Sequence, residues 1–215
     1  MKLLMLLKFL MIIILPFLLF LIVLNIVGFD QTLYENTFSA HQVYKALPDA
    51  SSLHEKIINF IKGKNDMAPV ELTEKEIQHL WDVRNLINIS TIILYLLVAL
   101  FIFLLVLSAL TLKMNNLITN FVGKVLIFGG LLTILLFALL FLFINSNFSA
   151  TFESFHKLFF KQDTYAFDAK AILVNLYPEQ LFMELGIRIS EWVIITSAII
   201  IILGVFLLLK SKKQK

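Results

Sequence analysis

The sequence predicts an all-α membrane protein: four transmembrane helices with an extracytoplasmic cap of amphipathic helices, and with short strands as an open alternative for one part of the cap. Of the 215 residues, 60% are hydrophobic and 15% are charged, and the mean hydropathy is +0.90. A soluble domain of this size cannot bury so much apolar surface, whereas a bilayer covers about 20 apolar residues per helix. We therefore expect one integral membrane domain over residues 1–215.

Four uncharged runs are each long enough to cross the hydrocarbon core of a bilayer. The expected spans are residues 9–27, 89–112, 125–144 and 192–209. The first run could instead be a cleaved signal peptide, but the apolar region of such a peptide is about 7 to 15 residues long and precedes a small-residue cleavage pattern. Neither property is found around residues 25–30, so we expect this helix to stay. Four spans place both termini on one side.

Lysines mark one end of the predicted bundle. The two segments at the other end, residues 28–88 and 145–191, hold all 15 Asp and Glu together with 10 Lys and Arg. Because membrane proteins keep their Lys-rich and Arg-rich loops in the cytoplasm, we expect cytoplasmic termini and a multi-pass protein of the cell membrane. Any active site should then face the extracytoplasmic side. The eight lysines at the cytoplasmic end are Lys2, Lys8, Lys113, Lys124, Lys210, Lys212, Lys213 and Lys215.

The first outer segment contains a short amphipathic helix. Ser52 and Glu55 have the spacing of a capping box, and an apolar stripe follows until Gly63 interrupts it. This stripe is expected to pack as a lid, with contact to the lipid headgroups as the alternative. Its residues are Leu53, Ile57, Phe60 and Ile61.

A second capping box, Thr73 with Glu76, opens a helix that runs on into the second span, because no Gly or Pro intervenes before residue 112. Along this helix Glu76, His79 and Asp82 recur at every third position. Residues at this spacing share one helix face. The sequence therefore predicts a polar face just outside the second span.

The second outer segment begins with an aromatic stripe at helical spacing, formed by Phe148, Phe152, Phe155 and Phe159. His156 lies at the edge of this stripe. Residues 165–177, which end before Pro178, show mixed spacing and could form a strand or an interfacial helix.

Spans two and three are joined by a short inner loop, so they should be antiparallel neighbours with their outer ends close together. His79 precedes the outer end of span two, and His156 follows the outer end of span three. We therefore expect the two imidazoles to meet. An imidazole titrates near pH 6.5 and can accept and return a proton in acyl transfer. Asp82 is placed to orient His79, and Glu76 is a supporting residue.

Other interpretations of these residues stay open. The histidines could be interfacial hydrogen-bonding residues, or Glu76, His79, Asp82 and His156 could bind a divalent metal, although they lack a compact ligand motif. Arg84 and main-chain N–H groups are candidate donors to an oxyanion. Arg188 pairs with Glu191 or snorkels to the interface, or it binds substrate.

Several function classes are excluded by composition. The net charge of +3 is dispersed, which argues against a nucleic-acid partner. The absence of cysteine removes thiol nucleophiles and cysteine-based metal or iron–sulfur sites. Nucleotide-binding and hydrolase motifs are missing. A transporter is disfavoured because the spans contain no charge.

Three stretches resemble a known family. TEKEIQHLWDVRNL (residues 73–86), FESFHKLFF (152–160) and FDAKAILVNLYPEQLF (167–182) are similar to the bacterial integral membrane family that includes the lipoprotein intramolecular transacylases. The resemblance covers the whole layout, and the motifs Glu-x-x-His-x-x-Asp-Val and Phe-His-x-x-Phe-Phe are specific when taken together. Tyr165 stands where many relatives are expected to have tryptophan.

The resemblance implies an acyltransferase that moves the sn-2 acyl chain of a diacylglyceryl lipoprotein to the α-amine of its N-terminal cysteine, giving the lyso form. It implies His156 and His79 as the catalytic pair, with either as the primary base, and no cofactor or metal. The expected partners are the lipoprotein N-terminus and membrane lipid. A metal-dependent lipid or peptide hydrolase and a non-catalytic membrane chaperone or scaffold are the alternatives.

Overall fold

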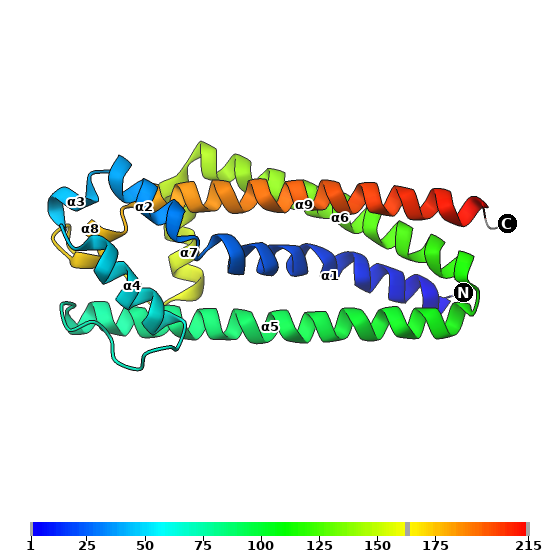
Figure 1. Cartoon of the computed structure of the whole chain (residues 1–215), viewed down its shortest axis with the longest axis horizontal. Helices are drawn as coiled ribbons and strands as arrows, with labels where there is room; N and C mark the ends of the chain where they lie inside the picture. The colour runs from blue at the N-terminus through cyan, green and yellow to red at the C-terminus, as the bar shows by residue number, and fades with distance from the viewer. Residues whose placement is uncertain (1, 162–163, 214–215) are drawn as a thin grey trace. The chain divides into compact units, whose positions relative to one another are not determined.

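The computed structural model describes residues 2–161 and 164–213, which fold into α-helices and connecting loops with no strand among them. Short strands, the open alternative for residues 165–177, are thus not found in the described part of the chain. The helices in chain order are α1 (Lys2–Val27), α2 (Gln31–Ala40), α3 (Val43–Ala46), α4 (Ala50–Ile61), α5 (Glu74–Leu112), α6 (Asn115–Ser146), α7 (Phe148–Phe159), α8 (Ile172–Leu176) and α9 (Glu179–Lys213) (Figure 1).

Four of these helices, α1, α5, α6 and α9, are long and apolar enough to cross a membrane, which confirms the predicted fold class. Helix α5 extends without a break from the Thr73 capping box through the second apolar run, as expected. The turn between α5 and α6 is tighter than expected. Helix α6 already begins at Asn115, after Lys113 has adopted a left-handed conformation with φ of 58°.

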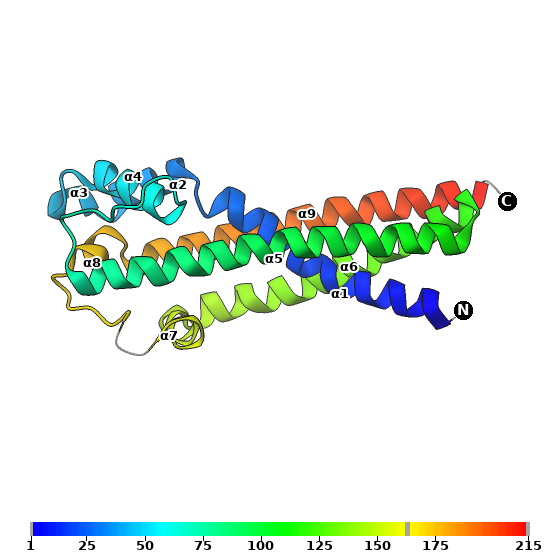
Figure 2. The same ribbon diagram turned by 90° about the horizontal axis from the view of Figure 1, so that it is seen from below.

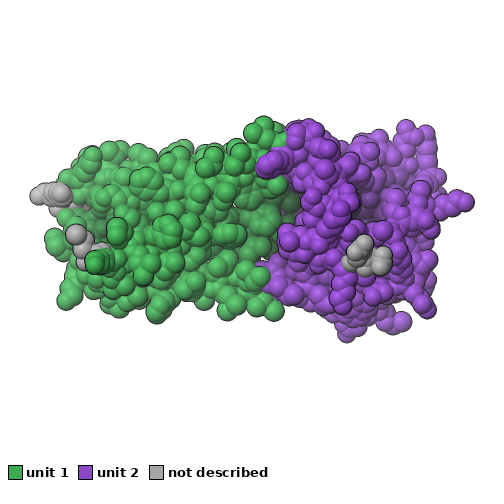
Figure 3. All heavy atoms as spheres, turned by 180° about the vertical axis from the view of Figure 1, so that it is seen from behind, with its two compact units in different colours: residues 1–25, 92–142, 188–215 green, residues 26–91, 143–187 purple. Residues whose placement is uncertain are grey.

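The chain divides into two compact units (Figure 3). The first contains the described residues of Met1–Asn25, Ile92–Leu142 and Arg188–Lys215, and the second contains Ile26–Thr91 and Phe143–Ile187. The four long helices contribute residues to both units, whereas α2, α3, α4, α7 and α8 belong to the second alone.

The first unit is built of parallel and antiparallel segments of the long helices. Side chains from α1, α5 and α6 form a buried apolar cluster that includes Met11, Leu104 and Val125. Helices α6 and α9 approach closely at Gly123 and Gly204, where a Cβ on either glycine would lie within 3.0 Å of the other's carbonyl oxygen. Many large apolar side chains of this unit remain exposed, among them Tyr95, Phe103 and Phe206. A bilayer would cover this surface.

The second unit has its own core around α2, α4 and α8, and Figure 2 shows α2, α3 and α4 gathered side by side. The imidazole of His54 is buried between aromatic rings, with the Tyr34 ring centroid 4.2 Å away, and its Nδ1 lies 2.9 Å from the Tyr177 hydroxyl. The stripe of α4 is buried, with Ile57 and Phe60 fully covered. The amphipathic helix therefore packs inside this unit, as the lid interpretation requires.

The expected capping box at Ser52 is wrong, because α4 begins at Ala50, after Asp49. Tertiary contacts extend the helix towards its N-terminus: Ala50 is fully buried, and the Ser51 hydroxyl donates a 2.9 Å hydrogen bond to the Glu35 carboxylate. The capping box at Thr73 is present. The Thr73 main-chain N–H donates to Glu76 Oε2 at 2.9 Å, and the Glu76 N–H donates to the Thr73 hydroxyl at 3.4 Å.

Candidate functional site

His79 and His156 meet in the second unit, as the sequence predicts. His79 lies in the second turn of α5 and His156 in the last turn of α7. Their rings are stacked, with centroids 6.1 Å apart and planes inclined by 24°. Two imidazoles from separate helices thus face a common region, an arrangement suited to moving a proton between groups bound there.

The position of the proton on His156 follows from its hydrogen bond. Nδ1 lies 2.8 Å from the main-chain oxygen of Phe152. Because a carbonyl oxygen only accepts, Nδ1 carries the hydrogen, and Nε2 of the neutral ring carries the lone pair. Burial lowers the pKa of His156 below its usual 6.5, although the Phe152 carbonyl acts in the opposite direction. The ring is therefore a neutral base at physiological pH.

His79 is more deeply enclosed. It lies ten positions before the apolar run that starts at Ile89. The pKa of His79 is lowered to about 4, chiefly by burial and also by the neighbouring His156, while the charge of Asp82 partly compensates. A neutral imidazole with this pKa is a poor base, but its N–H remains a hydrogen-bond donor.

Asp82, which the sequence places to orient His79, makes no described hydrogen bond to it. Asp82 Oδ2 and His79 Nδ1 are both buried, and neither has a hydrogen-bond partner among the described residues. Buried polar atoms without partners are rare and costly in native proteins, and they concentrate where function requires them. Asp82 therefore acts on His79 through its charge, and both atoms keep unused hydrogen-bonding capacity.

Aromatic rings surround the two histidines. Phe160 and Phe167 lie 4.9 and 5.5 Å from the His79 ring, centroid to centroid. Phe152 and Tyr165 lie 4.2 and 5.1 Å from the His156 ring. These rings exclude water, which explains the lowered pKa values. Sequence reasoning missed Phe167 and Tyr165 as walls of the site, because the loop before α8 has no periodic pattern to indicate where its side chains lie.

Glu76 links two segments of the second unit by hydrogen bonds. Its side chain is almost completely buried (1% exposed). Oε2 accepts hydrogen bonds from the Thr73 N–H and hydroxyl, and Oε1 accepts one of 2.8 Å from the Leu173 N–H of α8. Burial alone would raise the pKa of Glu76, but these hydrogen bonds outweigh it and lower the pKa below its usual value. Glu76 supports the site by joining the start of α5 to α8.

The arginines do not join the histidines in the described contacts. The Arg84 guanidinium lies 2.9 Å from the Asp66 carboxylate and over the rings of Phe60 and Trp81. It is thus engaged on another face of α5, and no described contact supports Arg84 as an oxyanion donor. Arg188 belongs to the first unit, and its role in substrate binding stays a prediction.

The metal alternative also lacks a ligand set. Within residues 2–161 and 164–213, no three His, Asp or Glu side chains are grouped so that they could hold a metal ion. Glu76, one of the four ligands considered, uses its carboxylate for the hydrogen bonds described above.

Comparison with known proteins supports the resemblance seen in the sequence. No curated protein matches the chain. Among solved structures, the fold is similar to that of the membrane integral lipoprotein intramolecular transacylase Lit from Bacillus cereus, with a TM-score of 0.81 and 21% identity over 98% of this chain and 97% of that one.

Two further structures of the Bacillus cereus protein, in which one histidine is replaced by arginine or by alanine, also match. Their TM-scores are 0.79 and 0.78, with 20% and 21% identity. Both cover 98% of this chain, and the chain covers 94% and 95% of them. At this level of identity the structures establish the fold. The family model described as lipoprotein intramolecular transacylase Lit matches residues 9–182. Because this match extends over most of the sequence, the chain belongs to the lipoprotein intramolecular transacylase Lit family.

Proposed function

We propose that this protein transfers the sn-2 acyl chain of a diacylglyceryl-modified lipoprotein to the α-amine of the same molecule's N-terminal cysteine. The product is an N-acylated lipoprotein whose glyceryl group keeps one chain. Family membership supports the reaction class. The observation that carries the proposal is the stacked pair of neutral imidazoles, with centroids 6.1 Å apart, inside an aromatic enclosure.

In the proposed reaction the amine nitrogen attacks the carbonyl carbon of the ester. Nε2 of His156 accepts the proton that this nitrogen loses, and the same proton passes to the glyceryl oxygen as the carbon–oxygen bond breaks. A positioned base of this kind contributes about 10² to 10⁴-fold to a rate. The α-amine, with a pKa of about 8, needs only a modest base, and the enzyme needs no nucleophile of its own.

His79 has a different proposed role. With a pKa of about 4, its imidazole stays neutral and can donate a hydrogen bond to the negative oxygen that develops on the ester carbon. Donors aimed at such an oxygen are often the largest single contribution to catalysis. Nδ1 of His79, which has no hydrogen-bond partner within the described part of the chain, would be this donor in the tautomer that carries its hydrogen on Nδ1. Asp82 would stabilise positive charge in this region and attract the substrate amine.

Intramolecularity provides much of the remaining acceleration. Amine and ester belong to one bound molecule, so the loss of translational freedom that a two-molecule reaction requires is avoided. The proposed location is the extracytoplasmic side of the bacterial cell membrane, with both termini cytoplasmic. The distribution of lysines supports this orientation.

The test is a mass spectrum of a lipoprotein N-terminus from bacteria that make diacylglyceryl lipoproteins, with and without this protein. We expect an N-acyl, lyso-glyceryl peptide only when the protein is present. His156→Ala and His79→Ala should abolish this product while the protein remains in the membrane. His41→Ala is the matched control, because His41 pairs with Glu184 at 2.9 Å and has no described contact with His79 or His156.

An unchanged diacylglyceryl cysteine with a free amine in the presence of wild-type protein would contradict the proposal. If both histidine variants formed the full amount of product, neither histidine would be required for catalysis, although the protein would still catalyse this class of reaction.

A further inference from the structure

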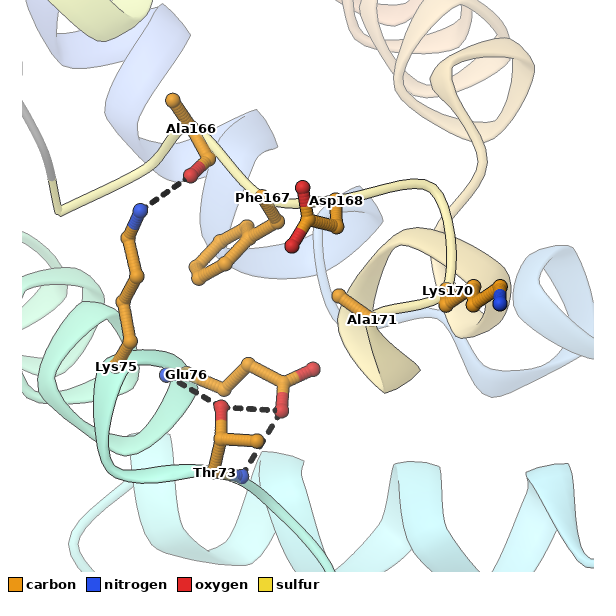
Figure 4. Close-up of a pocket in the computed structure, with 8 residues that line it drawn as sticks. All are labelled: Thr73, Lys75, Glu76, Ala166, Phe167, Asp168, Lys170 and Ala171. Carbon is orange, nitrogen blue, oxygen red and sulfur yellow. Dashed lines mark hydrogen bonds between the residues drawn. The ribbon is translucent and has the colours of Figure 1, made fainter.

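A pocket of about 320 Å³ opens beside the histidines, between the start of α5 and the loop that leads into α8. Its lining residues are Thr73, which directly precedes α5, Lys75 and Glu76 of α5, and Ala166, Phe167, Asp168, Lys170 and Ala171 of the loop. Figure 4 shows Phe167 between Lys75 and the Asp168 carboxylate, with Glu76 below them. The functional roles given above to the histidines do not use this pocket.

Phe167 is a wall shared by the pocket and the histidine site. Its ring lines the pocket and also packs edge-on against the His79 ring at 5.5 Å. The Lys75 ammonium lies 5.5 Å from the centroid of the same ring. Lys75 and His79 are four residues apart and so share a face of α5. The pocket therefore begins one helical turn away from the reacting region.

The order of features along α5 matches the order of parts in a lipoprotein. With a rise of about 1.5 Å per residue, His79 lies about 15 Å from the start of the apolar run at Ile89, and Lys75 lies about 6 Å farther away in the same direction. A lipoprotein has acyl chains at one end, the ester and amine next, and then its polypeptide. With acyl chains near Ile89 and the ester at His79, the polypeptide would continue towards Lys75.

The pocket carries groups that suit a peptide backbone. A peptide unit presents one N–H donor and one carbonyl acceptor. The exposed Asp168 carboxylate has no described side-chain hydrogen bond among residues 2–161 and 164–213, so it can accept an N–H. The Lys75 ammonium donates one of its three hydrogens to the Ala166 carbonyl oxygen. Its other hydrogens can reach a carbonyl oxygen of the bound chain.

A phospholipid headgroup fits this pocket less well. A phosphate is bound best by cations and N–H donors without a carboxylate nearby, whereas the lining of this pocket carries the carboxylates of Glu76 and Asp168 beside the ammonium groups of Lys75 and Lys170. Opposite charges on one wall suit a neutral chain of alternating donors and acceptors.

We propose that this pocket binds the first residues of the lipoprotein that follow the lipidated cysteine. The inference rests on the proposed function and assigns a specificity element to the same reaction: Asp168 and Lys75 hold the peptide, which aligns the cysteine amine and the ester with the histidines. Binding energy from a part of the substrate remote from the chemistry is thereby used to position the reacting groups.

The test uses two synthetic substrates in detergent micelles: a diacylglyceryl cysteine amide with no following residue, and the same group on a pentapeptide. For wild-type protein we expect kcat/KM to be about tenfold higher with the pentapeptide. The cysteine amide lacks the peptide groups that would bind Asp168 and Lys75, and one hydrogen bond to a charged group is worth about this much. Asp168→Ala should lower kcat/KM about tenfold for the pentapeptide and leave the cysteine amide within about twofold. Lys75→Met, which keeps the aliphatic stem, should do the same.

Asp49→Ala is the matched control. Asp49 is exposed, belongs to the same unit and makes no side-chain capping bond, so both substrates should react as with wild type. Equal losses of kcat/KM on both substrates in the Asp168 and Lys75 variants would overturn the inference. If those losses depended on anionic lipid in the micelles, the pocket would instead bind a lipid headgroup. Wild-type protein that converts neither substrate would overturn the proposed function, and this inference with it.

Discussion

The Nδ1 atom of His156 donates a 2.8 Å hydrogen bond to the carbonyl oxygen of Phe152, one helical turn earlier. This bond leaves Nε2 as the basic atom, while burial lowers the pKa of the ring. His79, stacked beside it, has a pKa lowered to about 4. Both rings are thus held neutral across the physiological pH range.

We accordingly predict that both histidines titrate below pH 6.5, His79 at the lower value. Two-dimensional NMR of protein labelled at histidine, in detergent micelles, measures this from the ring chemical shifts between pH 8 and 4, with His79→Gln and His156→Gln assigning the signals. A midpoint at or above 6.5 for His156 would contradict the enclosed geometry. The Nδ1–H tautomer of His156 is read from the ring nitrogen shifts in the same samples.

The Tyr165 ring closes the site beside His156, at 5.1 Å. Tyr165→Trp keeps a flat apolar surface there, so we expect an acyl-transfer rate within about threefold of wild type. Tyr165→Ala opens the enclosure to water, which should raise the pKa of His156 towards its usual value. A histidine with its usual pKa of about 6.5 is about one-quarter neutral at pH 6, so we expect the activity at pH 6 to fall by up to about fourfold, with little change at pH 8.

The acyl-transfer rate at pH 6 and pH 8 measures this effect. Tyr95→Ala serves as the control, because Tyr95 is 70% exposed in the first unit. Equal rates for Tyr165→Ala and wild type at both pH values would show that the ring does not protect His156.

His54 makes the second unit sensitive to acid. Burial lowers the pKa of His54 to about 4, and the nearby Glu35 carboxylate compensates only in part. The unfolded chain, in which histidine has a pKa near 6.5, therefore binds the proton first as the pH falls. Stability contributed by the neutral ring is complete above about pH 7 and is lost progressively down to about pH 4. Between pH 7 and 5 the expected loss is about 2 kcal/mol.

Melting temperatures in detergent at pH 7 and pH 5 check this prediction. The double variant His54→Phe with Tyr177→Phe removes both partners of the 2.9 Å hydrogen bond, so no polar atom of that pair is left unsatisfied. Its melting temperature should fall less on acidification than that of wild type. The same fall in both proteins would place the acid sensitivity elsewhere.

Gly204 allows α6 and α9 to approach in the first unit. A Cβ at this position would lie 2.8 Å from Ile127 Cγ1 and 2.9 Å from the Gly123 carbonyl oxygen. Small residues permit such close helix packing in membranes. Because a backbone atom cannot rotate aside, we expect Gly204→Ala to destabilise the protein by about 1 to 3 kcal/mol.

Thermal unfolding in detergent measures this cost. Gly186→Ala is the comparison, since its Cβ would lie 3.0 Å from Cδ1 and 3.9 Å from Cγ1 of the Ile144 side chain, whose terminal methyl group can move. Equal melting temperatures for the two variants would mean that α6 and α9 tolerate separation at Gly204.

The long helices could be predicted because a bilayer demands uninterrupted apolar runs, and such runs are visible in any sequence. The capping box at Thr73 was equally local, since donor and acceptor are three residues apart. Helix α9 begins at Glu179, well before the predicted span at residues 192–209, and this start was not predicted because the intervening segment contains polar and charged residues. A signal was nevertheless present, because Leu181, Leu185 and Ile189 recur every fourth residue and are all buried.

The meeting of His79 and His156 followed from the connection of two adjacent spans by a short turn. The aromatic walls and the pocket at Lys75 could not be inferred in the same way. Phe167 and Asp168 lie in a loop whose conformation is fixed by contacts with α5, about ninety residues earlier, and no local pattern encodes such contacts. The one available clue was that Lys75 lies four positions before His79 and so shares its helix face.

The hydrogen bonds of Glu76 have a consequence for a sequence that contains no cysteine. By accepting hydrogen bonds from the main-chain N–H groups of Thr73 and Leu173 at the same time, one carboxylate links two distant stretches of chain as a disulfide would. Unlike a disulfide, this fastening is indifferent to oxidants and reductants and forms without an enzyme. It is released only when strong acid adds a proton to the carboxylate.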